Sequence, residues 1–534
     1  MRLLYQTSLL VAETIGRRPR GMFPAGYGTH GEGKPMDDRT RQQISDDPAE
    51  AGATQRVSRR AALKRLGALG LAASSCGALS SLSLVPDRVV QAAPAGYPNI
   101  QFNIGDYIPP ARTIDGIAMA MPPVYTLFVT AKLTRPSAPA RHDQQMLAHA
   151  LDTIEDAYSF SPSGLFIHVA YGKPYFNRLP AALVTAHLPL FKATREAVLQ
   201  EAVPGPTDFP TVPKKTFKVP VRIEANDLLI TLRGDTLDNL TDVVDWLKGS
   251  NRLHDRHVDS PDVGELFTFT STRVMFVQIG LPRKMADHHD LPYAERVNDK
   301  SPMWMGFFSQ QANGFGPATI ATFQGNASAQ FTGMGATLRP VAPSDYLYDG
   351  AIQVLAHDIL DLPQWYDGEE QTYAERAQLM FRSNPIPNQG NEDQYKNGGG
   401  PAALPNLVVP SDAHGNSDAF NDAHEKHRLG HLQALQRATR APDGTIIPQR
   451  VDGPGFDAMD VPDGSRQPKL QFSVFLPSAQ NFAKARVNAG GTDLSPSQVP
   501  PGHNGIERFM TATRRQNFLC PPRAHRAFPL LELT

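Results

Sequence analysis

YTLFVTAK, residues 125–132, is the first segment of the chain with the composition of a buried β-strand. It follows a Pro-Pro pair and is rich in β-branched and aromatic residues, as strands are. Residues 141–158 then carry apolar side chains at helical spacing, and residues 165–170 (LFIHVA) are again typical of a strand. Together these segments predict a strand–helix–strand unit.

The same order of elements occurs a second time before residue 285. A strand at 227–232 (DLLITL), a helix at 237–247 and a strand at 266–279 form a second strand–helix–strand unit. Two such units in tandem are the plan of a ferredoxin-like domain, in which helices cover one face of an antiparallel sheet. We therefore expect an α+β protein whose N-terminal ferredoxin-like domain spans residues 120–285.

A looser version of this order fills the second half of the chain. We expect a strand at 351–356, a helix at 362–381, a strand at 469–476 and a helix at 479–487. Two final strands follow at 508–513 and 518–520. A long polar segment, residues 382–466, lies among them and is rich in Asn, Gly, Pro, Asp and His. The pattern predicts a second ferredoxin-like domain over residues 300–530 with a polar insertion, and such insertions are often functional.

Residues 58–93 have the features of a twin-arginine signal peptide. The pair Arg59 and Arg60 precedes a weakly apolar run rich in Ala, Gly and Ser, and the small residues around Ala92 suit cleavage. Residues 1–57 show no apolar periodicity, and we expect them to be disordered or an extended start of the reading frame. The signal predicts export of the folded protein by the twin-arginine translocase to a secreted or cell-surface location. The alternatives are an uncleaved anchor, a chance arginine pair, and lipid attachment at Cys76.

The composition excludes some classes of protein. The 534 residues have a formal net charge of −1, so no basic field indicates a nucleic-acid partner. Of the two cysteines, Cys76 lies in the export segment, so Cys520 alone remains after cleavage and no internal disulfide can form. The 41% of hydrophobic residues permits a stable core instead.

Three histidines lie close together inside the polar insertion. Residues 419–440 return to helical spacing, which would place His424, His427 and His431 on one face of a helix. Two of them could chelate a metal ion with a further ligand from elsewhere, or one could be the axial ligand of a haem. A polar, solvated helix face is the third interpretation, and the spacing alone leaves all three open.

The order of several segments resembles that of the dye-decolourising (DyP-type) haem peroxidases. The segments that carry the resemblance are Asp227–Ile230, Met305–Gln310, Gly350–Ala356 with Leu362–Trp365, Gly430–Leu432 with Arg437 and Arg440, Ile447–Asp452, and Leu470–Leu476 with Phe482. They occur in the order that the family has, and the chain resembles a divergent member. The resemblance implies two ferredoxin-like domains of the dimeric α/β-barrel kind and export by the twin-arginine route.

The resemblance also implies a haem b cofactor and gives His431 and Arg450 a role. His431 corresponds to the proximal haem ligand, and Arg437 lies in the same segment. Arg450 corresponds to the distal arginine, which would stabilise negative charge on the leaving oxygen of hydrogen peroxide. Arg515 is a candidate for pairing with a haem propionate, because a guanidinium matches a carboxylate with two hydrogen bonds. The implied activity is the peroxide-dependent oxidation of an unknown electron donor.

One position departs from the pattern of the family. The family has an aspartate in its distal loop that helps to move a proton between the peroxide oxygens, and the corresponding residue here is Ser309. A serine hydroxyl takes up no proton at neutral pH. Asp452 is a candidate substitute acid, although a turn residue before Gly453 and Pro454 is the other interpretation. A non-catalytic exported protein that binds haem or a metal is therefore the alternative function.

Other charged and aromatic residues have two interpretations each. Arg514, Arg515 and Arg523 either contact haem propionates or form ion pairs within the fold. Trp304 and Trp365 either relay electrons to the surface or belong to the buried core. Burial and ion-pair partners distinguish these interpretations.

Replacing both Arg59 and Arg60 by Lys is expected to stop export, because the translocase recognises the arginine pair. The measurement is cell fractionation followed by detection of the protein in the cytoplasmic and exported fractions. The matched control replaces Arg17 and Arg18, a pair with no long apolar run after it. Normal export of the first variant would contradict the signal-peptide interpretation.

Overall fold

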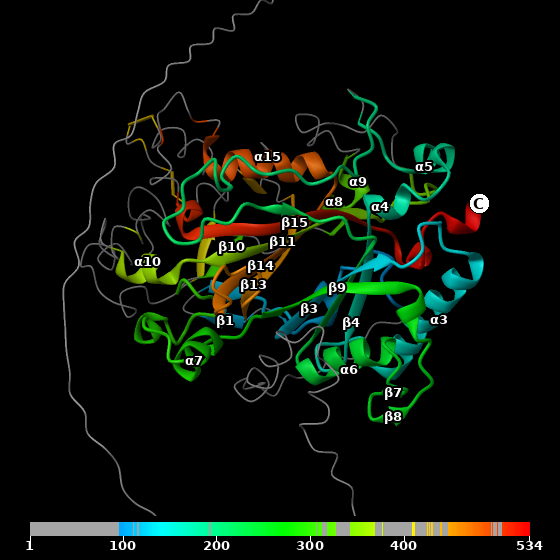
Figure 1. Ribbon diagram of the computed structural model, residues 1–534, viewed down its shortest axis with the longest axis horizontal. Helices are drawn as coiled ribbons and strands as arrows, with labels where there is room; N and C mark the ends of the chain where they lie inside the picture. Colours follow the sequence, from blue (N-terminus) through cyan, green and yellow to red (C-terminus); the bar gives the residue numbers. More distant parts are fainter. Residues whose placement is uncertain are drawn as a thin grey trace, which may run out of the picture. The chain divides into compact units, whose positions relative to one another are not determined.

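One antiparallel sheet, curled on itself, connects the two halves of the computed structural model (Figure 1). The structure describes residues 96–110, 112–114, 117–191, 194–306, 308–311, 318–326, 342–368, 376, 408–411, 424, 425, 427, 429, 430, 438, 439, 447–492, 494, 499 and 505–534. All of these residues belong to the same compact unit of the chain. Residues 1–57 and the predicted signal peptide, residues 58–93, lie outside the described residues.

The N-terminal half has the strand order of a ferredoxin-like unit. Its elements along the chain are β3 (Tyr125–Leu133), α3 (Arg141–Ala157), β4 (Phe166–Gly172), β6 (Leu228–Gly234), α6 (Leu237–Leu247) and β9 (Phe267–Phe276). In the sheet the strands lie in the order β4-β6-β3-β9, and every neighbouring pair is antiparallel. The first and third strands of the unit are therefore central.

The C-terminal half repeats this arrangement. Its elements are β11 (Ala351–Leu360), α10 (Leu362–Asp367), β13 (Gln449–Asp457), β14 (Gln467–Leu476), α15 (Ala479–Gly490) and β15 (Met510–Cys520). The strands lie in the order β13-β14-β11-β15, again antiparallel and again with the first and third strands in the centre. The repeated order confirms the prediction of an α+β fold built from two ferredoxin-like units.

The remaining elements are short. The helices are α4 (Lys173–Phe176), α5 (Ala181–His187), α7 (Leu281–His288), α8 (Ala318–Ala321) and α9 (Phe323–Asn326). The strands are β1 (Arg112–Ile114), β2 (Ile117–Met119), β5 (Arg222–Ile223), β7 (Arg252–Leu253), β8 (Arg256–His257), β10 (Phe308–Gln311) and β12 (Val408–Ser411). No helix among the described residues is long and apolar enough to cross a membrane.

Three boundaries differ from the sequence prediction. The helix predicted over 362–381 ends at Asp367, because Gly368 is extended with φ −60° and ψ 139°. The two final strands are one strand, β15, which continues through Arg514 and Arg515. The segment 449–457, which the sequence pattern assigned to the polar insertion, is β13 and pairs with β14 along its whole length.

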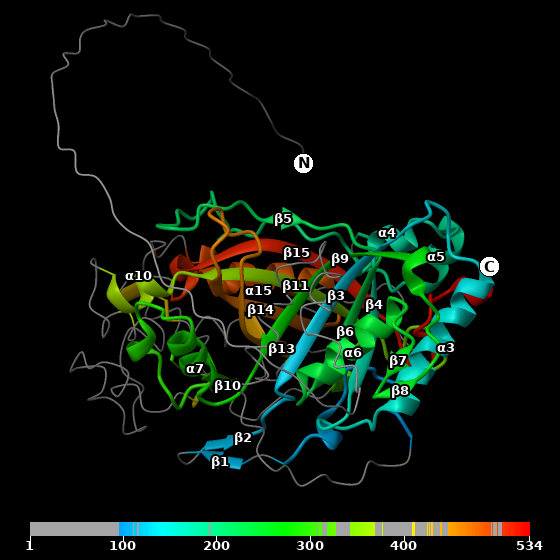
Figure 2. The same cartoon turned by 60° about the horizontal axis from the view of Figure 1, so that its bottom comes forward.

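The sheet curls until its end strands, β13 and β9, lie against each other (Figures 1 and 2). A Cβ atom on Gly455 would lie 3.0 Å from the carbonyl oxygen of Val274, so the absence of a side chain allows this approach. The buried indole of Trp304 donates from Nε1 to the carbonyl oxygen of Gly455 at 2.9 Å. We call the curled sheet from β13 to β9 the barrel. Its two faces are the barrel interior and the outer, helix-covered face.

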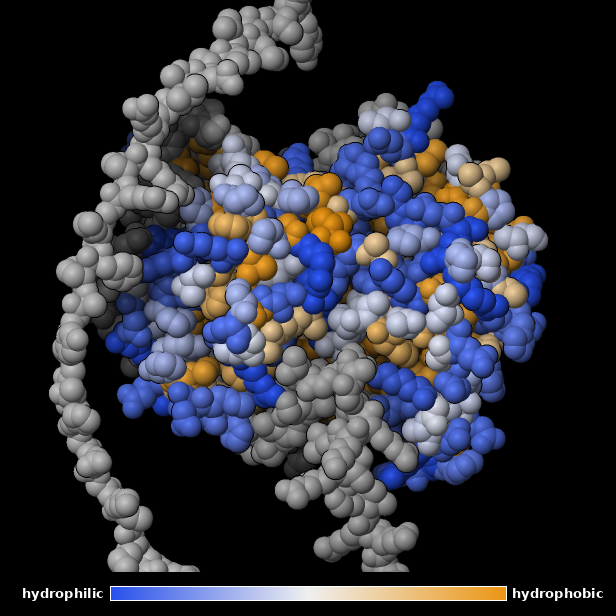
Figure 3. All heavy atoms as spheres, in the orientation of Figure 1, coloured by the Kyte–Doolittle hydropathy of each residue, from blue (hydrophilic) through white to orange (hydrophobic). Residues whose placement is uncertain are grey.

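The alternation of side chains along each strand divides the core in two. On β3, Leu127 and Val129 belong to the large outer cluster against the helices, whereas Phe128 belongs to the inner cluster. Phe102 also enters the barrel interior, where its ring stacks on that of Phe475 with centroids 3.9 Å apart. The face drawn in Figure 3 shows apolar residues scattered among hydrophilic ones, as expected when most apolar surface is inside. Trp365 is buried too, and the core interpretation of both tryptophans is confirmed.

Gly455→Ala is expected to lower the free energy of unfolding by about 1–3 kcal/mol, because the new methyl group would crowd β9 and Gln471. The control is Gly105→Ala, where the nearest atom to a new Cβ is 3.7 Å away and a change within about 0.5 kcal/mol is expected. Denaturant unfolding measures both variants. Equal stability of the two would show that the strands do not meet as described.

Candidate functional site

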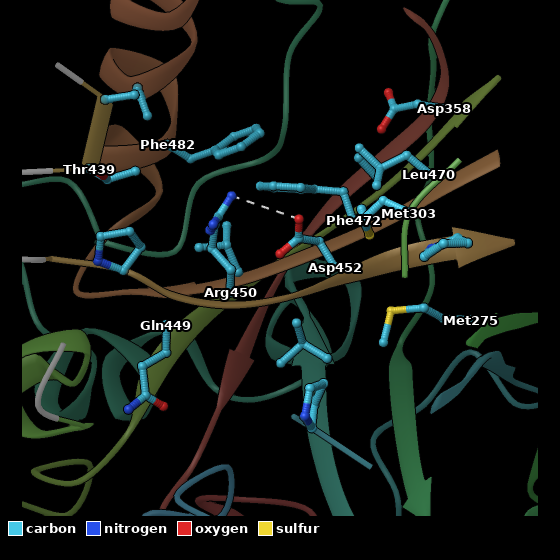
Figure 4. A pocket seen from close by; sticks show the side chains of 18 of the residues that line it. Met275, Met303, Asp358, Thr439, Gln449, Arg450, Asp452, Leu470, Phe472 and Phe482 are labelled. Carbon is cyan, nitrogen blue, oxygen red and sulfur yellow. Dashed lines mark ion pairs between the residues drawn. The ribbon is translucent and has the colours of Figure 1, made fainter. Parts of the chain in front are cut away.

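A cavity of about 290 Å³ lies beside β13 (Figure 4), and its wall is formed by side chains of α15 on one side and by side chains of the barrel interior, such as Met275, on the other. Most of its described wall is apolar. The main apolar side chains are Met275, Leu470, Phe472, Val474, Leu476 and Phe482. Ligand pockets with a few polar groups in an apolar wall start at about 300 Å³, so this cavity is the candidate binding site of the fold.

Arg450 and Asp452 project into this cavity from β13. Residues two apart on a strand share a face, and both side chains lie on the side that α15 covers, while Gln449 points to the other side (Figure 4). Their register partners on β14 are Val474 and Phe472. Nη1 of Arg450 and Oδ2 of Asp452 are 3.8 Å apart, an ion pair longer than a hydrogen bond. The predicted distal arginine and the candidate acid therefore lie side by side.

The turn interpretation of Asp452 is wrong. β13 continues through Gly453 and Pro454, which pair in register with Gln471 and Leu470 of β14. Proline lacks a backbone N–H group and is tolerated at the edge of a hydrogen-bonded ladder, where β13 lies. Residues 452–454 would favour a turn on their own. Their pairing with β14 and their contact with β9 keep them extended.

Two arginines at the wall of the cavity, the buried Arg515 and the partly exposed Arg486, have carboxylate partners. Arg515 donates from Nη1 and Nη2 to the two oxygens of Asp208, at 2.6 and 3.0 Å. Arg486, on α15, donates to both carboxylate oxygens of Glu507, at 3.2 and 3.0 Å. Burial alone would raise the pKa of Asp208, but the hydrogen bonds and charge of Arg515 hold that pKa below its usual value. Arg515 thus forms an ion pair of the fold, and its contact with a propionate stays a prediction.

Arg514 and Arg523 also have carboxylate partners. Arg514 donates from Nε and Nη2 to the two oxygens of Asp460, at 2.6 and 2.8 Å. Arg523 forms an ion pair with the largely buried Glu155. The ion-pair interpretation of these arginines is confirmed, and neither of them lines the cavity.

Asp358, on β11, is a carboxylate that the sequence pattern did not single out. Its side chain lines the cavity and is 6% exposed. Among the described residues, none donates a hydrogen bond to it or forms an ion pair with it. Burial raises the pKa of Asp358 to about 6, although the nearby charges of Arg515 and Arg486 oppose the shift. A carboxyl group that titrates near neutral pH in a cavity can take up and return a proton.

The side chains of three predicted site residues lie outside the described part of the structure. Ser309 lies on β10, whose backbone pairs in parallel with β12, and its side chain lies outside the described residues. His431 and Arg437 lie entirely outside the described residues. Their predicted roles stay predictions.

The single helix predicted over 419–440 is wrong at His427. That residue has a φ of 51°, in the left-handed region, which no residue of a continuous α-helix adopts. His424 and His427 are both exposed, as a polar surface requires. One helix therefore does not carry all three histidines on one face. In the part of the chain that the structure describes, no group of three or more His, Cys, Asp or Glu side chains could hold a metal ion.

The chemistry of Asp358 had a weak signal in the sequence. β11 reads AIQVLAHDIL, in which Gln353, His357 and Asp358 interrupt an otherwise apolar run. A polar residue within a buried strand is a candidate for function or for a buried ion pair. His357 forms the pair, since its Nε2 lies 3.4 Å from Oδ2 of Asp457 in the barrel interior, whereas Asp358 faces the cavity.

The sequence model of a family of unknown function, DUF7405, matches residues 123–522. The chain belongs to this family. The match covers all strands of the barrel, and it includes Arg450, Asp452 and Asp358. No curated protein matches this DUF7405 protein.

Solved structures to which this DUF7405 protein is similar are peroxidases of the DyP type. The encapsulated DyP-type peroxidase from Mycobacterium smegmatis is 12% identical, with a TM-score of 0.41 over 78% of this chain and 96% of that chain. The dye-decolorizing protein from V. cholerae is 14% identical, with a TM-score of 0.41 over 79% and 99%. The dye-decolorizing peroxidase from Bacteroides thetaiotaomicron VPI-5482 is 11% identical, with a TM-score of 0.41 over 80% and 98%. Likenesses this distant assign no role to any residue.

Asp358→Asn is expected to stabilise the protein at pH 7.5 by up to about 3 kcal/mol, because ionising a carboxyl group whose pKa is about 6 in the folded state is unfavourable there. The pKa of Asp358 is lower in the unfolded state than in the folded state. Ionisation of Asp358 therefore lowers the free energy of unfolding of the native protein as the pH rises from about 4 to 6. The advantage of the variant should therefore grow over that range and stay constant above it.

Denaturant unfolding at pH 4 and pH 7.5 measures this dependence. The control is Asp460→Asn, since the Arg514 hydrogen bond holds the pKa of Asp460 low although burial alone would raise it. This control should lower stability at pH 7.5. A pH-independent effect of Asp358→Asn would contradict the raised pKa.

Proposed function

We propose that this DUF7405 protein binds haem in the cavity beside β13 and oxidises an unknown electron donor with hydrogen peroxide. The observation that carries the proposal is the position of Arg450, which faces an apolar cavity from the strand whose sequence resembles the distal segment of DyP-type peroxidases. Export by the twin-arginine route is part of the proposal, and the Arg59 and Arg60 pair supports it.

The described wall fits the chemistry of a haem. Phe472 of β14 and Phe482 of α15 supply flat apolar surface, and the small side chains of Ala485 and Ala489 of α15 also line the cavity. Such a lining suits an apolar macrocycle, and Arg450 would add a cation to the same cavity. His431 would be the axial ligand by the sequence resemblance. When bound, the haem iron supplies the redox chemistry.

The residues of the chain would supply charge stabilisation and proton transfer. Arg450 would stabilise the negative charge that develops on a leaving peroxide oxygen, and Asp452, 3.8 Å away, orients its guanidinium. Asp358 has a pKa of about 6 after burial, so it can accept a proton at neutral pH and give it back. Asp358 and Asp452 thus offer two carboxylates where the family's own acid position holds Ser309.

The alternative is a protein of the same fold that binds haem or a metal without turnover. The serine at position 309 favours it, because that residue replaces the family's proton-transferring acid. Both functions use the same cavity, so the reaction with peroxide separates them.

The test is the absorption spectrum of protein produced with haem supplied, followed by addition of hydrogen peroxide. A Soret band is expected, and His431→Ala should abolish it while the control His424→Ala should keep it. Arg450→Ala should keep the band and slow the peroxide reaction by roughly 100-fold, as removal of a charge-stabilising donor does. A haem spectrum without any peroxide reaction would support the non-catalytic alternative. A normal spectrum of His431→Ala would overturn the ligand assignment.

A further inference from the structure

Arg233 is a buried cation without a partner. It lies near the end of β6, is 6% exposed and lines the same cavity as Arg450. Its Nε atom has no hydrogen-bond partner, and no carboxylate among the described residues forms an ion pair with its guanidinium. Burial lowers the pKa of Arg233 to about 10, so the group still carries its charge at neutral pH.

Two neighbours of Arg233 in the barrel interior also have an unsatisfied polar atom. Thr126 of β3 lies directly opposite Arg233 in register, and its buried Oγ1 has no hydrogen-bond partner. His168 of β4 pairs with Thr231, two residues before Arg233, and its buried Nε2 has no partner. Burial, with the charges of Arg233 and Arg523, lowers the pKa of His168 to about 3, so its imidazole is neutral.

These three side chains have the chemistry of an anion site. A guanidinium, a hydroxyl and a neutral imidazole can each donate a hydrogen bond, and none of them brings a negative charge. A buried charge without a counter-ion destabilises a fold, and such a group is normally paired. The missing counter-ion is therefore expected to come from a ligand.

The shape and wall of the cavity narrow the class of ligand. Phe102, Ile104, Pro122 and Met275 line it together with Arg233, so an apolar body can lie against them. A single guanidinium balances one negative charge and matches a carboxylate with two parallel hydrogen bonds. A phosphate dianion would leave one charge uncompensated at this end of the cavity.

We propose that Arg233 binds the carboxylate of a small ligand with an apolar body, in the part of the cavity that reaches the barrel interior. Thr126 and His168 do not line the cavity themselves, but they lie beside Arg233 on the two neighbouring strands and bring no competing negative charge to it. The site goes beyond the proposed haem function and does not require haem, because it uses the interior ends of β3, β4 and β6 rather than the β13 side of the cavity.

The test uses benzoate as the probe and calorimetric titration of the full chain as purified. Benzoate is expected to bind at least tenfold more tightly than benzamide, its neutral isostere. Arg233→Met should reduce the affinity for benzoate to that for benzamide. Arg233→Lys should have an intermediate affinity, because it keeps the positive charge but cannot form the two parallel hydrogen bonds of a guanidinium. The control Arg256→Met, at an exposed arginine, should bind benzoate normally.

Thermal unfolding of the same variants separates binding from a structural role. Without benzoate, Arg233→Met should melt at a higher temperature than the native protein, because it removes an unpaired buried charge. A lower melting temperature with unchanged benzoate affinity would overturn the proposal, and so would tighter binding of inorganic phosphate than of benzoate. His431→Ala should still bind benzoate, so failure of this site and failure of haem binding are distinguishable.

Discussion

The contact between β13 and β9 is the constraint on which the rest of the structure depends. It brings together the two ends of the sheet order, and Gly455 with the indole of Trp304 fixes how closely they meet. Once the ends meet, every strand has one face in the interior and one under helices, and the sheet has no long free edge. The cavity lies next to this contact, so Arg450 and Asp452 owe their placement to it as much as to their own strand.

The order of strands and helices could be predicted from the local sequence pattern. The strands whose conformation depends on partners distant in the sequence, β13 and β15, could not be predicted completely. β3, β4, β6 and α6 are strongly periodic, and their predicted bounds agree with the structure within a few residues. β13 escaped prediction, because Gly453 and Pro454 weaken its strand propensity and its pairing with β14 decides its conformation. β15 was split in two, because Arg514 and Arg515 look like a break until Asp460 and Asp208 neutralise them.

The residues of the candidate site also fall into those that the sequence indicated and those that only the structure revealed. Arg450 could be found, because it lies in a segment with a recognisable sequence. Asp358 and Arg233 could not, because a charged residue in an apolar strand can be either a ligand-binding group or half of a buried ion pair until the structure shows whether a partner lies opposite it. Arg515 is the contrasting case, since both of its Nη atoms donate to the carboxylate of Asp208. The sequence gives the charges, and the tertiary contacts decide which of them remain available for a ligand.

The junction of β15 with β4 has a further consequence. Only two register pairs, Phe518 with Gly172 and Leu519 with Tyr171, join the two ferredoxin-like units within the main strand order. Each unit alone would expose the strand that the other one covers, as two separate subunits would before they associate. Because both units lie on one chain, their association is intramolecular and has a high effective concentration. Closure of the barrel is therefore independent of protein dilution.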